Sequence, residues 1–420
     1  MRGFFDKERI QTPYKSEKGI LSCVSCGLYK TAQTPKMAPY GLGRKKIMVI
    51  GEGPGEDDDK RGKPWQGEIG RVLRRKYQEF GINLFTDCIS LNAVNCRPVD
   101  KDGNTRYPND HEIACCRQKV IRAIRQYQPK LILLHGGAAV SSLLTGYRWR
   151  GGKPTGINAW RGWTIPDREF QAWICPTFHP FFVTKKEEKN AIEVIWTNDL
   201  QQAFSKLQEP FPAFMNDEDC VVISHDPGSV LFKILRERPS LLAFDIETTG
   251  IKPYNKEDHK IVSISFCWEE GRAFAIPFPE ESRHFRLLKR ILECPEIGKI
   301  AANMKYEDSW LNVLHNIHVQ SWVFDTMQAA HILDNRPGIT GLKFQSFVNF
   351  GLPQYDQDVS PYLQSKAPNV PNKIMDLVKS ETFFRKLLLY NGIDSLMTYR
   401  LALKQMKEIG LERDFSFFGR

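Results

Sequence analysis

The sequence predicts two consecutive α/β domains. The chain has 420 residues, which is too long for one ordinary hydrophobic core. Short apolar segments alternate with longer amphipathic segments in both halves, as expected for sheets covered by helices. The proline-containing stretch 209–212 interrupts this alternation. We therefore expect a first domain at 1–207, a linker at 208–216 and a second domain at 217–420.

The first half is expected to form a parallel sheet. We expect strands at 46–50, 88–94, 130–134 and 173–177, separated by helices at 67–80, 110–126 and 190–207. The glycine-rich segment 51–55 directly follows the first strand, and His179 closely follows the last. Loops that carry chemistry gather at the carboxyl ends of parallel strands. We therefore expect these motifs to share one edge of the sheet.

The second half also alternates between strands and helices. We expect a strand at 241–246, a strand pair at 261–266 and 273–276, a helix at 285–292 and a strand at 299–302. From there to the end the pattern is mostly helical.

The charge balance favours an anionic partner. Lys and Arg outnumber Asp and Glu by 59 to 49, and neutralisation of phosphates by basic side chains supplies much of non-specific DNA binding. A merely soluble basic protein fits the charge equally well. No apolar run reaches the length of a membrane span, and the charged segment 1–18 lacks the apolar core of a secretory signal. We expect an intracellular protein with no membrane partner.

Carboxylates recur in three segments of the second half. Asp245 and Glu247 lie two residues apart on an expected strand, and therefore on one face of it. Like charges held so close repel each other unless a cation lies between them, and carboxylate oxygens suit hard divalent ions.

The other two segments add acidic and aromatic side chains. Glu307 and Asp308 form an acidic pair shortly after Asn303, while Tyr390 and Asp394 share one face if their segment is helical. Each segment alone is more often a solvated edge than a site. All three in this order favour a catalytic site.

Together these segments resemble the three exonuclease motifs of the DEDD family, in particular the proofreading domain of family A DNA polymerases. Neighbouring stretches at 324–327, 341–345 and 387–401 resemble polymerases encoded by bacteriophages. The resemblance covers about 217–410. It implies a ribonuclease H-like 3′–5′ exonuclease domain with a mixed sheet, which acts on single-stranded or frayed 3′ ends of DNA.

The resemblance also implies roles for the residues. Asp245, Glu247 and Asp394 would hold two Mg²⁺ or Mn²⁺ ions, one to activate the attacking water and one to stabilise the leaving 3′ oxygen. Tyr390 would orient the water, and Asn303 would contact the substrate. The family has Asp in the second motif where this chain has Glu307 with Asp308 beside it. Either carboxylate could serve, and position favours Glu307.

The sequence ends at Arg420, soon after the third motif. We therefore expect no polymerisation by this chain, although a separate polymerase subunit or a longer natural chain could supply it. The phage-like stretches imply a cytoplasmic, nucleic-acid-associated protein of a bacterial or phage-infected cell.

Cysteines mark a candidate metal site in the first half. Cys23 and Cys26 form a C-x-x-C pair, a generic pattern that could equally hold zinc. The surrounding motifs are more specific, and they occur at 51–55, 62–67, 92–98, 161–162 and 179–180. Over about 18–207 this order resembles the family 4 uracil-DNA glycosylases. The resemblance implies an α/β/α fold and a structural [4Fe–4S] cluster on Cys23, Cys26, Cys96 and Cys116, with Cys115 as a bystander.

The same resemblance implies a pocket for a flipped uracil. Trp65 would stack on the base where the family has Phe, and Asn92 would read its edge. His179 would stabilise charge on the departing uracil. Glu52, with Asp58 in the following acidic loop, would stabilise the positive charge on the sugar and position water. Gly53 would contact the substrate.

Three readings of the whole chain remain open. The first is a bifunctional repair enzyme that excises uracil and trims 3′ ends. The second is a proofreading accessory subunit of a split polymerase, whose glycosylase-like domain reads template uracil without cleavage. Phe181-Phe182-Val183 and Thr105 depart from the glycosylase pattern and keep this reading open. The third is a DNA-binding scaffold with two degenerate sites, against which the intact exonuclease motifs argue.

Overall fold

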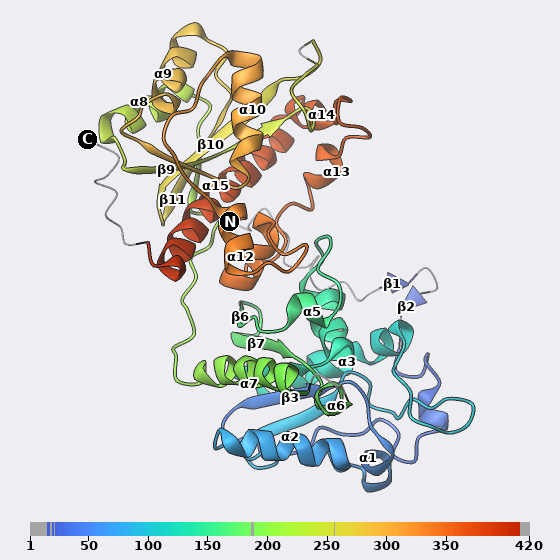
Figure 1. Ribbon diagram of the computed structural model, residues 1–420. Helices are drawn as coiled ribbons and strands as arrows, with labels where there is room; N and C mark the ends of the chain where they lie inside the picture. Colours follow the sequence, from blue (N-terminus) through green and yellow to red (C-terminus); the bar gives the residue numbers. More distant parts are fainter. Residues whose placement is uncertain (1–14, 17–18, 21, 186–188, 256, 412–420) are drawn as a thin grey trace. The chain divides into compact units, whose positions relative to one another are not determined.

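The computed structural model describes residues 15–16, 19–20, 22–185, 189–255 and 257–411. The beginning of the first expected domain and the end of the second therefore lie outside the described residues. The chain forms two compact units (Figure 1). Among the described residues, the N-terminal unit contains those up to Ala213 together with Phe347–Pro353. The C-terminal unit contains Phe214–Ser346 and the described residues from Gln354 onward.

The described part of the N-terminal unit contains a five-stranded sheet in the order β4-β3-β5-β7-β6. Its strands are β3 (Ile47–Gly51), β4 (Cys88–Asn92), β5 (Leu131–His135), β6 (Ile165–Asp167) and β7 (Ala172–Thr177). All neighbours are parallel except β6, which pairs antiparallel with β7. The expected parallel sheet is confirmed, with β6 as an additional edge strand.

Helices surround this sheet. Every residue of β3, β4 and β5 is buried, as expected for strands covered on both faces. The longer helices are α2 (Glu68–Glu79), α3 (Asp110–Tyr127) and α7 (Lys189–Ser205), close to their expected bounds. The shorter elements are β1 (Lys15–Ser16), β2 (Gly19–Ile20), η2 (Leu28–Lys30), α1 (Glu56–Arg61), α4 (Gly137–Val140), η3 (Ser141–Arg148), α5 (Ile157–Trp160) and α6 (Pro180–Lys185).

The acidic stretch that contains Asp58 is not the loop that we expected. It forms α1, because Gly55 occupies the N-cap and donates its N–H to the Asp58 carboxylate at 3.1 Å. Acidic side chains in a first helical turn also interact favourably with the helix dipole. Asp59 is buried and accepts backbone N–H groups from Gln33 and Thr34.

The C-terminal unit contains, among its described residues, a six-stranded sheet in the order β13-β12-β9-β10-β11-β8. The strands are β8 (Val221–Ile223), β9 (Leu241–Thr248), β10 (Ile261–Glu269), β11 (Arg272–Pro277), β12 (Gly298–Ala301) and β13 (Trp322–Asp325). β10 is antiparallel to both β9 and β11, whereas the other pairs are parallel. The expected mixed sheet is confirmed. The mostly helical expectation after 302 missed β13, which is only four residues long.

The helices of this unit are α8 (Pro227–Glu237), α9 (Ser282–Leu292), α10 (Met304–His315), α11 (Thr326–Leu333), α13 (Ser360–Leu363), α14 (Ile374–Val378) and α15 (Glu381–Ile409). The helix α12 (Leu342–Phe350) begins in this unit, and its residues from Phe347 onward are assigned to the N-terminal unit. α15 packs along β9, β10 and β11. At Gly392, an added Cβ would lie 2.3 Å from Val221 Cγ1. Glycine inside a helix is destabilising by itself, so this close approach to the sheet explains the residue. Within the described ranges, no helix is long and apolar enough to cross a membrane.

Candidate functional sites

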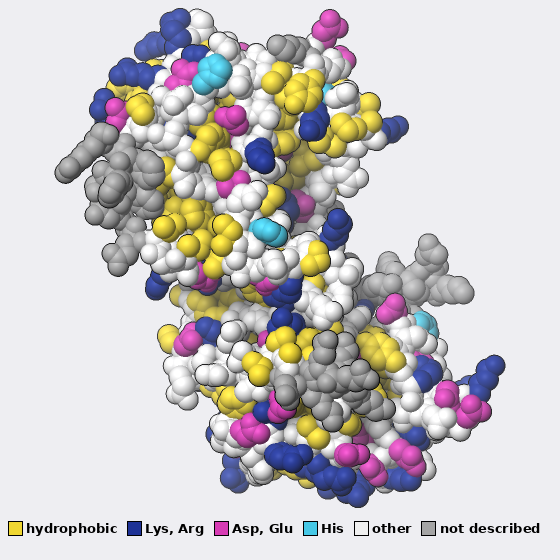
Figure 2. Space-filling view, in the orientation of Figure 1, with side chains coloured by type: hydrophobic (Ala, Val, Ile, Leu, Met, Phe, Trp, Pro, Cys, Tyr) yellow, Lys and Arg dark blue, Asp and Glu magenta, His cyan; other side chains and the backbone are white. Residues whose placement is uncertain are grey.

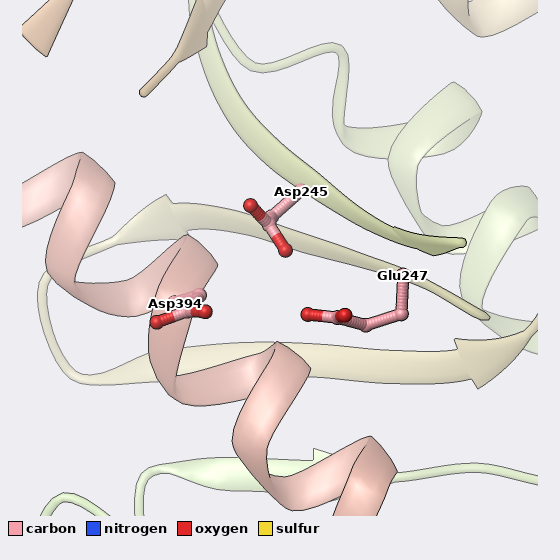
Figure 3. A group of neighbouring side chains, drawn as sticks. All are labelled: Asp245, Glu247 and Asp394. Atoms are coloured by element: carbon pink, nitrogen blue, oxygen red, sulfur yellow. The ribbon is translucent and has the colours of Figure 1, made fainter. Parts of the chain in front are cut away.

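Three carboxylates meet between a strand and a helix of the C-terminal unit. Asp245 and Glu247 lie on β9, and Asp394 lies on α15. Each can offer one oxygen such that all three oxygens lie within 4.8 Å of one another. Figure 3 shows the three side chains turned toward a common centre. The alternation of side chains along β9 is what places both of its carboxylates on the face that α15 covers.

The charges in this cluster oppose one another. Burial, followed by the charge of Asp394, raises the pKa of Asp245 well above its usual range, and burial followed by Asp245 does the same for Glu247. Asn391 Nδ2 donates to Asp245 Oδ2 at 2.7 Å, which favours the charged form but does not outweigh the burial. Buried carboxylates in this state are a suitable donor set for a hard divalent cation, which would relieve their repulsion.

The two carboxylates of the second motif have different surroundings. Glu307 on α10 is buried, and burial and the charge of Asp245 raise its pKa well above its usual range. None of the described residues pairs with Glu307 Oε2. Asp308 instead accepts a hydrogen bond from Trp322 Nε1 at 3.2 Å. The charge of Asp245 therefore acts on Glu307, whereas Asp308 is hydrogen-bonded to the indole of Trp322.

Asn303 precedes α10 in a left-handed conformation, with φ of 76°. Its backbone N–H and that of Met304 donate to the Asp325 carboxylate, each at 3.0 Å. Asp325 thus anchors the helix that carries Glu307. Asp325 lies in the phage-like stretch 324–327, but no functional role was predicted for it.

Two further residues of the C-terminal site were also missed. Lys343 Nζ donates to the Tyr390 hydroxyl at 2.7 Å and to Asp394 Oδ2 at 3.2 Å. The Tyr355 hydroxyl donates to Asp394 Oδ1. Lys343 belongs to the phage-like stretch 341–345, which was the available signal. Tyr355 had none, because only the fold brings it to α15.

Asn92 and Trp65 converge at the end of β3 in the N-terminal unit. A Cβ on Gly51 would lie 2.5 Å from Asn92 Oδ1 and 2.7 Å from Trp65 Cζ2, so glycine allows both side chains to approach the strand. Among the described residues, Asn92 Nδ2 and Trp65 Nε1 are buried donors without a hydrogen-bond partner. Trp65 also has φ of 62°, an uncommon conformation that often marks functional sites.

His179 completes this group. Its ring stacks against Trp65 with centroids 5.4 Å apart. Burial, followed by the charge of His135, lowers the pKa of His179 to about 3, so the ring is neutral at physiological pH. Its Nδ1 accepts the Phe181 N–H at 3.3 Å, which places the ring proton on Nε2. His179 is therefore a neutral hydrogen-bond donor.

Glu52 lies immediately after β3. Burial raises its pKa to about 7, against the opposing effect of hydrogen bonds from the backbone of Ala138 and Gly137 and from Tyr107. Gly53 follows it, and an added Cβ there would contact Pro98 at an ordinary 3.5 Å. The Asp58 oxygens accept backbone N–H groups of Gly55 and Gln66, so this carboxylate shapes the loop.

Five cysteine thiols lie near one another in the N-terminal unit, those of Cys23, Cys26, Cys96, Cys115 and Cys116. Burial raises the pKa of the Cys116 thiol to about 12, and the nearby thiols of Cys26, Cys96 and Cys23 add smaller contributions in the same direction. The Lys36 N–H donates to Cys96 Sγ at 3.1 Å. Lys119 adds a nearby positive charge that acts on the same thiols. Hydrogen bonds and positive charge at sulfur suit a set of thiolate ligands. Cys115, taken as a bystander, contacts Cys26 and lies 3.7 Å from His111 Nε2 through its sulfur.

Basic side chains accompany the N-terminal site. Lys and Arg gather on the surface over α1 and α2 (Figure 2). The exposed basic residues of these helices are Lys60, Arg61, Arg71 and Arg75. Exposed Glu56, Asp57, Glu68 and Glu79 lie on the same two helices, so this surface carries charges of both signs.

Comparison with known proteins matches each half of the chain to a family. Residues 38–201 match the family model of the uracil DNA glycosylase superfamily. The type-4 uracil-DNA glycosylase of Thermotoga maritima is 30% identical over 190 residues, which cover 45% of this chain and 92% of that relative. The chain belongs to the type-4 uracil-DNA glycosylase family. This membership rests on its N-terminal unit.

The rest of this type-4 family member matches a second family. Residues 228–408 match the model described as 3′–5′ exonuclease. The DNA polymerase of Bacillus phage SP01 is 24% identical over 332 residues, which cover 71% of this chain and 34% of the polymerase. That alignment is longer than either unit and therefore extends over parts of both. Escherichia coli RNase D, an exoribonuclease, shares 16% identity and a TM-score of 0.33, covering 47% of this chain and 46% of its own. The chain thus joins a glycosylase-family domain to a 3′–5′ exonuclease domain, both of them hydrolase domains of DNA processing.

Proposed function

We propose that this protein trims DNA from the 3′ end and excises uracil, using one site in each unit. The carboxylate cluster of Asp245, Glu247 and Asp394 is the single observation that carries the exonuclease assignment. The substrates are single-stranded or frayed 3′ ends, and uracil-containing DNA.

In the exonuclease site, Asp245, Glu247 and Asp394 would hold two Mg²⁺ or Mn²⁺ ions, with Glu307 as the carboxylate of the second motif. Such ions supply an activated water and offset the charge of the leaving 3′ oxygen. Tyr390 orients the attacking water through its hydroxyl. Asn303, at the start of α10, contacts the terminal nucleotide.

In the glycosylase site, the flipped base stacks on Trp65 and meets the amide of Asn92. Asn92 Nδ2 is an unpaired buried donor in the described structure, and a carbonyl oxygen of the base can accept from it. His179, neutral and protonated at Nε2, stabilises the charge that develops on the departing uracil. Ionised Glu52 stabilises the positive sugar and positions water, with Gly53 and Asp58 shaping the loop around it.

Cys23, Cys26, Cys96 and Cys116 would hold a [4Fe–4S] cluster, which has a structural role and supplies no chemistry to the reaction. The thiols, the N–H donor at Cys96 and the charge of Lys119 support this assignment. Bound in this way, the cluster ties the loop before β3 to the loop after β4 and to α3.

A second candidate function is a proofreading accessory subunit of a split phage-type polymerase, which would read template uracil without cleaving it. The likeness to the phage polymerase favours it, because this chain covers 34% of that protein and the likeness extends over parts of both units. A separate polymerase subunit would then be the partner.

One assay distinguishes the two functions. A 5′-labelled single-stranded oligonucleotide with one internal uracil is incubated with Mg²⁺ or with EDTA. We expect a ladder that shortens from the 3′ end with Mg²⁺ alone, and an alkali-sensitive break at the uracil in EDTA. A ladder without the break favours the accessory subunit. The absence of both contradicts the bifunctional enzyme, and trimming that appears only with a polymerase added supports the second function.

A further inference from the structure

Lys343 lies inside the carboxylate cluster without belonging to any of its motifs. It is the second residue of α12, and its side chain is 30% exposed. Its Nζ donates to the Tyr390 hydroxyl at 2.7 Å and to Asp394 Oδ2 at 3.2 Å, and it lies 4.6 Å from the centre of the Tyr390 ring. Two of its three donors therefore hold the two functional residues of the third motif.

Its charge is as important as its hydrogen bonds. A lysine ammonium is positively charged at neutral pH, and Nζ of Lys343 lies 3.2 Å from Asp394 Oδ2. A cation among carboxylates offsets part of the negative potential that attracts divalent ions. A Lys343 cation should therefore weaken the binding of any metal at this site.

The hydrogen bonds have the opposite consequence for turnover. Because Lys343 donates to the phenol oxygen of Tyr390, that oxygen is engaged as an acceptor, and the hydroxyl proton is directed elsewhere. Asp394 is fixed at both oxygens, by Lys343 at Oδ2 and by Tyr355 at Oδ1. Reacting groups held in one geometry react faster than groups that must first be ordered.

We propose that Lys343 is a positioning residue of the exonuclease site, which fixes Tyr390 and Asp394 for turnover and in return lowers the affinity of the site for divalent ions. This inference rests on the proposed exonuclease function. It predicts that loss of the lysine moves metal affinity and turnover in opposite directions. A merely structural role would weaken both together.

The test compares Lys343→Met with Lys343→Arg and with Lys386→Met in the full-length chain. Lys386 pairs with Asp358 at 2.7 Å, outside the carboxylate cluster, and serves as a matched control for the loss of a lysine–aspartate pair. Mn²⁺ binding is measured by calorimetry without DNA, and trimming of a labelled single strand is measured at saturating Mn²⁺.

For Lys343→Met we expect Mn²⁺ to bind about tenfold more tightly, while the saturated trimming rate falls roughly 10²-fold. Lys343→Arg keeps the charge and should retain Mn²⁺ affinity near that of the wild type, with part of the rate recovered. Lys386→Met should match the wild type in both measurements.

Weaker Mn²⁺ binding by Lys343→Met, or an unchanged trimming rate, would overturn the inference. If Lys343→Met does not fold, an Mn²⁺ affinity of Lys343→Arg that departs strongly from the wild type would also overturn it. Failure of the proposed function has a different signature. In that case the wild type itself neither trims DNA nor binds Mn²⁺ more tightly than Asp394→Asn.

Discussion

The two candidate sites of this protein differ in the charge of their polar groups. The C-terminal site brings together three carboxylates, those of Asp245, Glu247 and Asp394. Because they are close to one another and buried, their negative charges repel strongly. The N-terminal site holds groups that are neutral or close to neutrality. His179 is uncharged, and Glu52 has its pKa near 7.

This difference in charge determines which reaction each site can support. A cluster of buried carboxylates needs cations before it can hold a phosphodiester, which is itself an anion. A pocket of neutral donors needs no ion to bind a neutral base and can stabilise the negative charge that appears as the base leaves. The first site should therefore depend on metal, and the second should depend on pH.

The largest expected effect is the loss of a metal ligand. Asp394→Asn removes one charged oxygen donor, and metal ions contribute several kcal/mol to such reactions. We expect trimming to fall on the order of 10³-fold, measured by the shortening of a labelled strand. Uracil excision in EDTA should not change. A loss of both activities would show that the two sites are not independent.

The reciprocal change is His179→Ala in the N-terminal site. Removing one donor that stabilises developing charge typically lowers a rate about 10²–10³-fold. We expect this loss in uracil release, measured as alkali-sensitive breaks, together with wild-type trimming. If uracil release stays at the wild-type rate, the role proposed for His179 is wrong.

The two sites should also differ in the pH dependence of their reactions. Base release needs ionised Glu52, so its rate should rise as pH increases through about 7. The hydrogen bond from Tyr107 favours the charged form of Glu52. Tyr107→Phe should therefore raise the pKa of Glu52 and move the midpoint upward by roughly half to one pH unit. A rate profile for uracil release between pH 5 and 9 checks this, and a midpoint that moves downward contradicts it.

The smallest expected effect concerns packing behind the exonuclease site. Gly392→Ala places a methyl group against Val221, and overpacking of this kind typically destabilises a protein by about 1–3 kcal/mol. Gly271→Ala is the control, because its added Cβ would meet only Met215 Cε at 3.8 Å. Denaturant unfolding measures both. Equal stabilities would mean that α15 can move away from the sheet.

Much of the fold followed from local pattern. The strands β3, β4, β5, β7, β9 and β12 and the helices α2, α3 and α7 lie close to their expected positions, because apolar runs and capping residues act over a few neighbours. Asn109 and Glu112 show this at the start of α3, where each side chain accepts the other's backbone N–H. The edge strands β6, β8 and β13 were not expected. They are about as short as the fully buried inner strand β12, but each has a partner strand on one side only, and β8 and β13 are incompletely buried.

The sequence indicated the types of chemistry in the candidate sites. Spacing alone paired Asp245 with Glu247 and Tyr390 with Asp394, whereas Asn92 and His179 were marked by the resemblance to a family. The charges and contacts of these groups depend on the tertiary structure. Glu307 rather than Asp308 lies under the influence of the cluster, and Lys343 and Tyr355 hold Asp394 from distant parts of the chain. Burial and long-range contacts set pKa values and hydrogen bonds, and neither is encoded in the spacing of a motif.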